Sequence, residues 1–148
     1  MKFKIAREKI LKPLQHLAGV VERRQTLPVL ANVLVVLDGD KLSITGTDTE
    51  VELVANLILD QQYPGGQTTI PAKKLLDICK SLPDGGVIDF EQEENRVIIK
   101  CGRSKFNLST LPAVEFPSLD DKKTAVQFAI RQGYLKELID KTSFAMAQ

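Results

Sequence analysis

The sequence predicts an α+β fold made of two repeated βαβββ halves, with helices on one side and antiparallel sheets on the other. Two observations predict it. At two places, a short strand-like segment leads directly into a helical segment with apolar residues at a 3.6-residue period. After each helical segment, three short segments rich in β-branched residues are separated by turn-forming residues. Because each half alone leaves a helix face and a sheet face uncovered, the halves are expected to pack together and bury both.

The first half begins with a strand over Lys2–Ile5 and continues in a helix over about Arg7–Val21. Pro13 lies inside that helix and lacks the N–H that would bond the preceding turn, so we expect a kink. Three strands follow, over Val33–Leu37, Lys41–Thr45 and Val51–Leu59. The turns between them, Asp38-Gly39-Asp40 and Gly46-Thr47-Asp48, consist of residues that tolerate tight turns.

The second half restarts the order with a strand over Thr68–Ile70. Pro71 then opens a helix that extends to about Leu82, since proline is favoured where a helical N–H would have no partner. The segment Pro83-Asp84-Gly85-Gly86 ends this helix. Three more strands follow, over Val87–Gln92, Arg96–Cys101 and Lys105–Thr110.

A third start follows a linker-like stretch at 117–121. Phe128-Ala129-Ile130-Arg131 resembles Phe3-Lys4-Ile5-Ala6, and Leu135 falls where Ile10 falls in the first helix. We therefore expect a first domain over residues 1–122, and the truncated start, a strand and a helix, of a second domain of the same kind over residues 123–148. The alternative is that residues 124–148 form a C-terminal helix that packs on the first domain.

Composition narrows the class of protein. With 43% hydrophobic and 26% charged residues, the chain is typical of globular material. No stretch reaches the roughly 18 apolar residues of a membrane span, and the charged N-terminus has no signal-peptide core, so we expect a cytoplasmic protein without a membrane partner. Cys79 and Cys101 form no CxxC pair, and His16 is the single histidine. Two free thiols are therefore expected, and no metal site or cofactor.

The net charge is only +1, but the charge is unevenly distributed. Residues 1–25 hold seven basic residues against two acidic ones, whereas residues 38–60 hold six acidic residues against one basic one. On the two helices, Lys12 and His16, and Lys73 and Lys80, lie opposite the apolar side. Such a polarised surface favours the approach of a polyanion from one side. The sequence contains no element that would read bases, so a nucleic acid would be held by its backbone.

Two enzyme-like features have simpler explanations. Glu50 and Glu52 alternate along one strand, which is typical of the solvent-facing side of a sheet. Cys79 lies on the apolar side of its helix, where a thiol is a poor nucleophile. We therefore expect no catalytic residues and no enzyme. A small cytosolic enzyme or ligand-binding domain, with a pocket between the two halves, remains the alternative, and it would require polar groups that converge in a cleft.

Several long segments resemble the β subunits of bacterial DNA polymerase III, the β sliding clamp family. They are MKFKIAREKILKPLQ, QTLPVLANVL, LSITGTDTEVE, TTIPAKKLLDICKSLP and GRSKFNLSTLPAVEFPSLD. The resemblance implies the DNA clamp fold and a replication processivity factor of three similar domains. Two such subunits close into a homodimer ring whose helices line the hole, and the ring holds double-stranded DNA without reading its sequence. Polymerase III and the clamp loader would bind through domains absent from this chain, in the cytoplasm at the nucleoid.

The resemblance also assigns residues. Arg24 and Lys73 match DNA-contacting positions of the family, and Lys12 and Lys80 are further candidates for the pore lining. The strand Arg103–Ser109 would close the ring by pairing with a partner's sheet. There Phe106 and Leu108 would fill an apolar pocket of the partner, and Arg103, Lys105 and Lys74 would pair with its acidic residues. The residues alone favour a different role for Phe106, as ordinary core.

Overall fold

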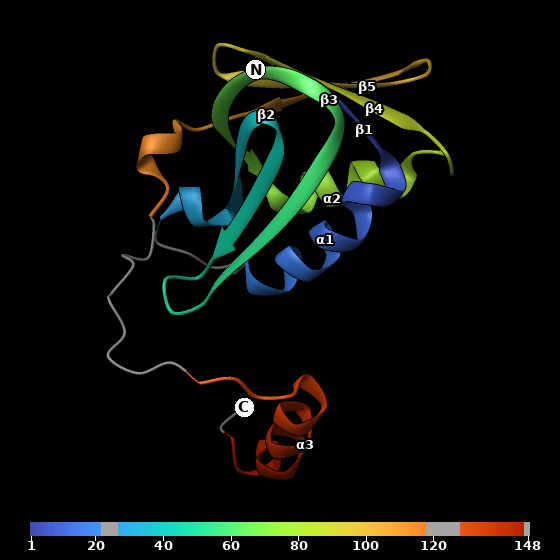
Figure 1. Ribbon diagram of the computed structural model, residues 1–148. Coiled ribbons are helices and arrows are strands. Elements are labelled where there is room, and N and C mark those ends of the chain that lie inside the picture. The colour runs from blue at the N-terminus through green and yellow to red at the C-terminus, as the bar shows by residue number, and fades with distance from the viewer. Residues whose placement is uncertain (22–26, 118–127, 147–148) are drawn as a thin grey trace.

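The computed structural model describes residues 1–21, 27–117 and 128–146. Its strands are β1 (Lys2–Ala6), β2 (Asn32–Thr47), β3 (Glu52–Pro71), β4 (Val87–Glu93), β5 (Arg96–Cys101) and β6 (Ser104–Ser109). Its helices are α1 (Arg7–Val20), α2 (Ala72–Ser81) and α3 (Gln132–Thr142), with 3-10 turns η1 (Pro28–Ala31), η2 (Ala113–Glu115) and η3 (Ser143–Ala145). Within these residues, no helix has both the length and the apolarity needed to cross a membrane. The predicted α+β fold with antiparallel sheets is confirmed (Figure 1).

The four-stranded sheet has the order β1-β4-β5-β6, with every neighbour antiparallel. Its first strand comes from the first repeat and the other three from the second. In the register between β1 and β4, Phe3 lies opposite Phe90, and their rings stack at a centroid distance of 4.7 Å. The two repeats therefore share a sheet, and neither repeat is a separate structural unit.

The strands β2 and β3 are longer than predicted. Residues 32–37 of β2 pair with residues 66–71 of β3, and residues 41–47 pair with residues 52–58. The predicted turn at Asp38-Gly39-Asp40 lies inside β2, where Gly39 has a φ of +61° and the register shifts on both sides of it. Figure 1 shows both strands as ribbons that curve back along their length. Gly39 still pairs opposite Tyr63, so the ladder of main-chain pairs continues through the bend and the separately predicted strands merge.

The helices α1 and α2 lie on the same side of the sheets and contact each other (Figure 1). α1 continues through Pro13 and buries Ile10, Leu14 and Leu17. α2 starts directly after Pro71, as predicted, and its apolar side is buried in the same core as the inner faces of the strands. Each large apolar side chain buried in this core contributes about 1.5–3 kcal/mol, so the pairing of α1 with α2 is held chiefly by apolar contact.

Polar contacts of Arg7 join the start of α1 to the end of α2. The Arg7 side chain donates from Nε to the carbonyl oxygen of Cys79 at 2.8 Å and from Nη1 to Asp84 at 2.6 Å. The Glu8 carboxylate accepts a bond from the N–H of Gly85, and this bond is the main reason that its pKa is lowered. The Cys79 carbonyl belongs to the last turn of α2, where carbonyls lack partners within the helix. Arg7 therefore caps α2 from a segment 72 residues away in sequence.

The segment 128–146 contains α3, and none of the residues of α3 is buried. Its apolar residues Tyr134, Leu135, Leu138 and Ile139 are exposed in the structure. A helix that packed on the first domain would bury such residues, so the structure lends no support to that alternative. That the segment starts a second domain stays a prediction.

Candidate functional site

The exposed faces of α1 and α2 carry three of the four predicted DNA-contacting residues, Lys12, Lys73 and Lys80. Lys73, Lys74, Asp77 and Lys80 are exposed on α2, and Lys12 and His16 are exposed on α1. α1 and α2 contact each other on one side of the sheets (Figure 1), so these residues belong to the helix side of the domain. Arg24, the remaining predicted DNA-contacting residue, lies outside the described residues.

The lysines on these helices differ in whether they have a partner. Lys9 pairs with Asp60 at 2.6 Å, a contact between α1 and β3. Lys12, Lys73 and Lys80 form no hydrogen bond or ion pair with any residue in the described ranges. Three ammonium groups on adjoining helices are thus available to an external anion.

Two hollows lie beside these lysines. One, of about 400 Å³, lies between α1 and α2 and is lined by Ala18, Val21, Ala31, Ala72, Lys73, Leu76, Asp77 and Lys80. The other, of about 230 Å³, lies between α1 and β3 and includes Lys12 and His16. The first is the pocket between the halves that an enzyme or ligand-binding domain would use. It is walled mainly by apolar side chains and holds three charged groups that form no ion pair with one another.

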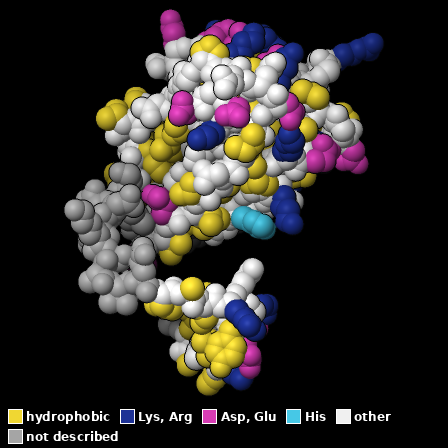
Figure 2. All heavy atoms as spheres, in the orientation of Figure 1, with side chains coloured by type: hydrophobic (Ala, Val, Ile, Leu, Met, Phe, Trp, Pro, Cys, Tyr) yellow, Lys and Arg dark blue, Asp and Glu magenta, His cyan; other side chains and the backbone are white. Residues whose placement is uncertain are grey.

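On the four-stranded sheet, opposite charges neutralise each other. Glu91 of β4 accepts from Lys2 at 3.1 Å and from Lys100 at 2.9 Å. These contacts, with the Lys100 hydrogen bond first, lower the pKa of Glu91, and the Glu91 hydrogen bond raises the pKa of Lys100. In Figure 2, dark-blue and magenta side chains are intermixed at the top of the molecule, where Figure 1 places β4 and β5. Glu91 thus neutralises Lys2 and Lys100, whereas Lys4 and Lys105 on the same sheet are exposed and form no ion pair within the described residues.

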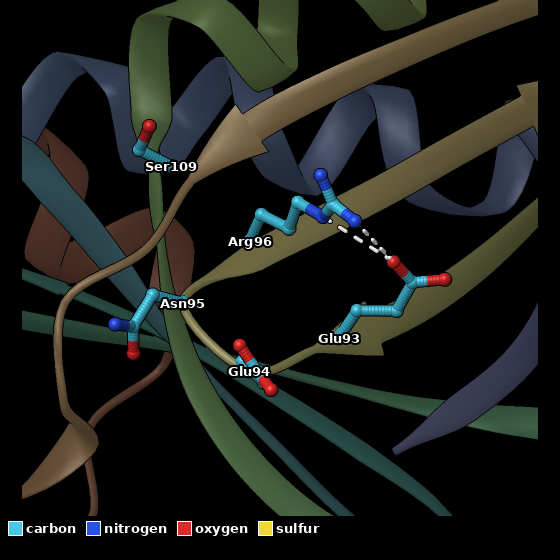
Figure 3. A pocket seen from close by; sticks show the side chains of 5 residues that line it. All are labelled: Glu93, Glu94, Asn95, Arg96 and Ser109. Atoms are coloured by element: carbon cyan, nitrogen blue, oxygen red, sulfur yellow. Dashed lines mark hydrogen bonds and ion pairs between the residues drawn. The ribbon is translucent and has the colours of Figure 1, made fainter.

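A third hollow, of about 730 Å³, lies at the turn between β4 and β5. Figure 3 shows the side chains around it, in which Arg96 donates from Nε and Nη2 to Glu93 Oε2 at 3.2 and 2.9 Å. Glu94, Asn95 and Ser109 complete its lining, and Glu94 takes a positive φ of 44° in the turn. Among the residues that line this hollow, the charge pair is the one between Arg96 and Glu93 of the hairpin itself. The lining contains no nucleophile hydrogen-bonded to a general base, which a catalytic site would need.

The carboxylate of Asp48 is engaged by the local turn. The Asp48 carboxylate accepts from the N–H groups of Val51 and Glu50, at 2.7 and 2.9 Å, and these bonds lower its pKa. Glu50 is exposed and Glu52 is half-buried. Among residues 1–21, 27–117 and 128–146, no group of three or more potential metal ligands comes together.

The prediction of two free thiols is confirmed, since Cys79 and Cys101 are both free and buried. Burial raises the pKa of Cys79 to about 12. At neutral pH this thiol stays protonated, and a protonated, buried thiol is a poor nucleophile.

The predicted ring-closing strand lies at an edge of its sheet. β6 pairs with β5 alone, so its other side has main-chain groups available to a neighbouring strand. Lys105 lies opposite Lys100 in the register, an unfavourable pair of like charges within the domain. Arg103, Lys105 and Lys74 are exposed and form no ion pair within the described residues, so all three can meet acidic groups of a partner.

The apolar residues of β6 fit the predicted interface less well. Leu108 is only 7% exposed and belongs to the core of this domain. That its side chain also meets an apolar pocket of a partner stays a prediction. Phe106 is half-buried and packs against the same core, so part of its ring remains for a partner and part acts as core.

Comparisons with known proteins point to one family. The family model of the DNA polymerase III beta subunit, N-terminal domain, matches residues 1–120. Over 148 residues the chain is 57% identical to the beta sliding clamp of Pseudomonas aeruginosa, and over 147 residues it is 48% identical to that of Escherichia coli K12. These matches cover 100% and 99% of this chain and 40% of each relative, so the chain spans about 40% of their length.

Solved structures give the same result. The crystal structure of the DNA polymerase III subunit beta from Pseudomonas aeruginosa matches with a TM-score of 0.95 at 56% identity. A structure of pol III beta from Caulobacter crescentus matches with a TM-score of 0.93 at 40% identity. Both matches cover 100% of this chain and 40% of the other. The fold of this chain is therefore closely similar to a part of these relatives that makes up 40% of each of them.

Proposed function

The chain belongs to the DNA polymerase III beta subunit family, and we propose that it is part of a sliding clamp that encircles duplex DNA and acts as a processivity factor in replication. The relatives it matches are named beta sliding clamps, and the sequence resemblance to this family is confirmed. The alternative of a small enzyme or ligand-binding domain gains no support from these comparisons.

The observation that carries the proposal is the set of unpaired ammonium groups on the two adjoining helices. Lys12, Lys73 and Lys80 are exposed on α1 and α2, and they form no hydrogen bond or ion pair within the described residues. Unpaired ammonium groups bind phosphates through the release of counterions, and this affinity does not depend on base sequence. The helix side is therefore the side that would face DNA, and Arg24 would extend it.

Weak contacts suit such a ring. If encirclement retains the DNA, the phosphate contacts need only keep the duplex centred, and tight contacts would oppose sliding. Lysine fits this role because it acts as a point charge, without the bidentate geometry of arginine. The lysines on α1 and α2 would accordingly release one phosphate and bind the next as the DNA moves. No chemical reaction would be catalysed.

The remaining parts of the proposal concern assembly. Residues 1–122 would form the first domain of the clamp, and residues 123–148 would begin the second. The ring would close as a homodimer through the β6 edge, with Lys74, Arg103 and Lys105 facing acidic residues and Phe106 at the apolar contact. Polymerase III and the clamp loader would bind other parts of the full-length protein, in the cytoplasm.

The test uses the full-length protein with Lys73→Ala and Lys80→Ala combined, and fluorescence anisotropy on short linear duplexes of several sequences. We expect weaker binding by the same factor for every sequence, and a slope of log K against log salt that is shallower by about 1.8, which corresponds to two lost phosphate contacts. Lys4→Ala and Lys41→Ala combined are the matched control, because both are exposed lysines on strands, β1 and β2, and the change in net charge is the same. A factor that varies with sequence, or an equal loss in the control, contradicts the proposal.

A further inference from the structure

The exposed face of α2 carries a carboxylate between two ammonium groups. Asp77 follows Lys73 by four residues and precedes Lys80 by three, and all three side chains line the hollow of about 400 Å³ beside α1. Residues three and four apart on a helix are neighbours on its surface. Asp77 is therefore in the middle of the surface that the proposed function turns toward DNA.

Asp77 also differs from other carboxylates of this domain that lie near lysines. Glu91 is bonded to Lys2 and Lys100, and Asp60 is bonded to Lys9. Within the described part of the chain, Asp77 forms no hydrogen bond or ion pair, although it has a lysine one turn away on either side. Its negative charge is therefore not neutralised by an ion pair within the described residues. It repels an anion, such as a phosphate, that approaches the exposed face of α2.

We propose that Asp77 limits how tightly the helix face holds phosphate, and this role rests on the proposed function. The Cβ atoms of residues three or four apart on a helix are about 5–6 Å apart. This spacing is inside the screening length of roughly 8 Å at physiological salt, so the Asp77 carboxylate repels a phosphate held by Lys73 or Lys80. The repulsion between the two anions lowers the affinity of each contact for any base sequence. Asp77 is thus a determinant of weak, exchangeable binding on a face that would otherwise carry only positive charge.

The structure offers a conservative way to remove this charge. Asp77→Asn keeps the size of the side chain, and because the residue is exposed and unpaired, the fold loses no contact. Asp38→Asn is the matched control, since Asp38 is an exposed aspartate in the bend of β2 and makes the same change in net charge. Asp77→Glu keeps the charge at the same position and is expected to bind DNA as the wild type does.

The experiment measures binding of a short linear duplex to the full-length protein by fluorescence anisotropy, over a salt series from about 0.05 to 0.2 M. We expect Asp77→Asn to raise the association constant about threefold near 0.15 M salt, with a smaller effect as salt rises because the repulsion is screened. Movement along DNA, followed by single-molecule tracking, is expected to slow by a similar factor.

The results for the aspartate variants and for the lysine variants test two different statements, the role of Asp77 and the proposed function. An unchanged association constant for Asp77→Asn, or an equal rise for Asp38→Asn, overturns the role of Asp77. If the combined Lys73→Ala and Lys80→Ala variant still binds more weakly, the proposed function stands without that role. If that combined variant binds as the wild type does, α2 does not face DNA, and the proposed function fails together with the inference.

Discussion

Replacement of Arg7 by alanine tests whether the cap on α2 holds the two helices together. The Arg7 side chain is 13% exposed, and it donates to the Cys79 carbonyl and to Asp84. Loss of a hydrogen bond from a charged donor costs about 1.5–3 kcal/mol, and here it leaves a carbonyl of the last helical turn without a partner. The contact with Asp84 adds little, because Asp84 is 95% exposed and water screens the pair.

We therefore expect Arg7→Ala to lower the free energy of unfolding by about 2 kcal/mol, dominated by the Cys79 contact. Asp84→Asn, which removes only the exposed charge, is expected to cost no more than about 0.5 kcal/mol. Urea unfolding followed by far-UV circular dichroism measures the free energy of unfolding of each variant and of the wild type under the same conditions. Equal losses in the two variants, or a loss below about 0.5 kcal/mol for Arg7→Ala, would refute the reasoning that Arg7 acts as the cap.

Three further predictions use other contacts. The pKa of Glu91 is lowered in the folded state, so its contribution to stability is complete above its ordinary value of 4.5 and is lost as pH falls through the lower folded value. Glu91→Gln is therefore expected to lose less free energy of unfolding than the wild type as pH falls below 4.5, because the charge that is titrated is absent. Urea unfolding over a pH series measures this difference. Phe106→Ala in the full-length protein is expected to shift sedimentation toward monomer, and an unchanged dimer would tell against the β6 interface. Cys79, whose thiol pKa is about 12, is expected to resist a thiol-reactive reagent at neutral pH until the chain is unfolded, and labelling of the folded chain would contradict its burial.

The local elements were predictable because their signals are local. The proline before α2, the glycines after it and the period of its apolar residues place that helix to within one residue of its observed ends. The strands β4 to β6 were also predicted closely, since tight turns separate them in the chain. The extent of β2 and β3 was not predicted, because both strands continue through a bend where Gly39 pairs with Tyr63, and no local pattern records a partner that far away.

The candidate site was predictable in part. The helical period places Lys12, Lys73 and Lys80 on solvent-facing sides, and the structure shows these residues exposed. The sequence could not show which lysines are neutralised by an acidic residue, because the partner of Lys9 is the carboxylate of Asp60, 51 residues away. The sequence also did not indicate that Leu108 packs in the core of this domain, since the side of an edge strand that faces the core depends on how its sheet packs.

The sequence by itself determined the order of helices and strands, their repetition and the polarity of the helices, since backbone preferences and apolar periods act over a few residues. Only the tertiary structure decided that β1 joins the sheet of the second repeat, that Arg7 caps a helix 72 residues away, and that Asp77 has no partner among the residues the structure describes. Each of these depends on contacts between distant segments, which form when the apolar faces of both repeats are buried in one core.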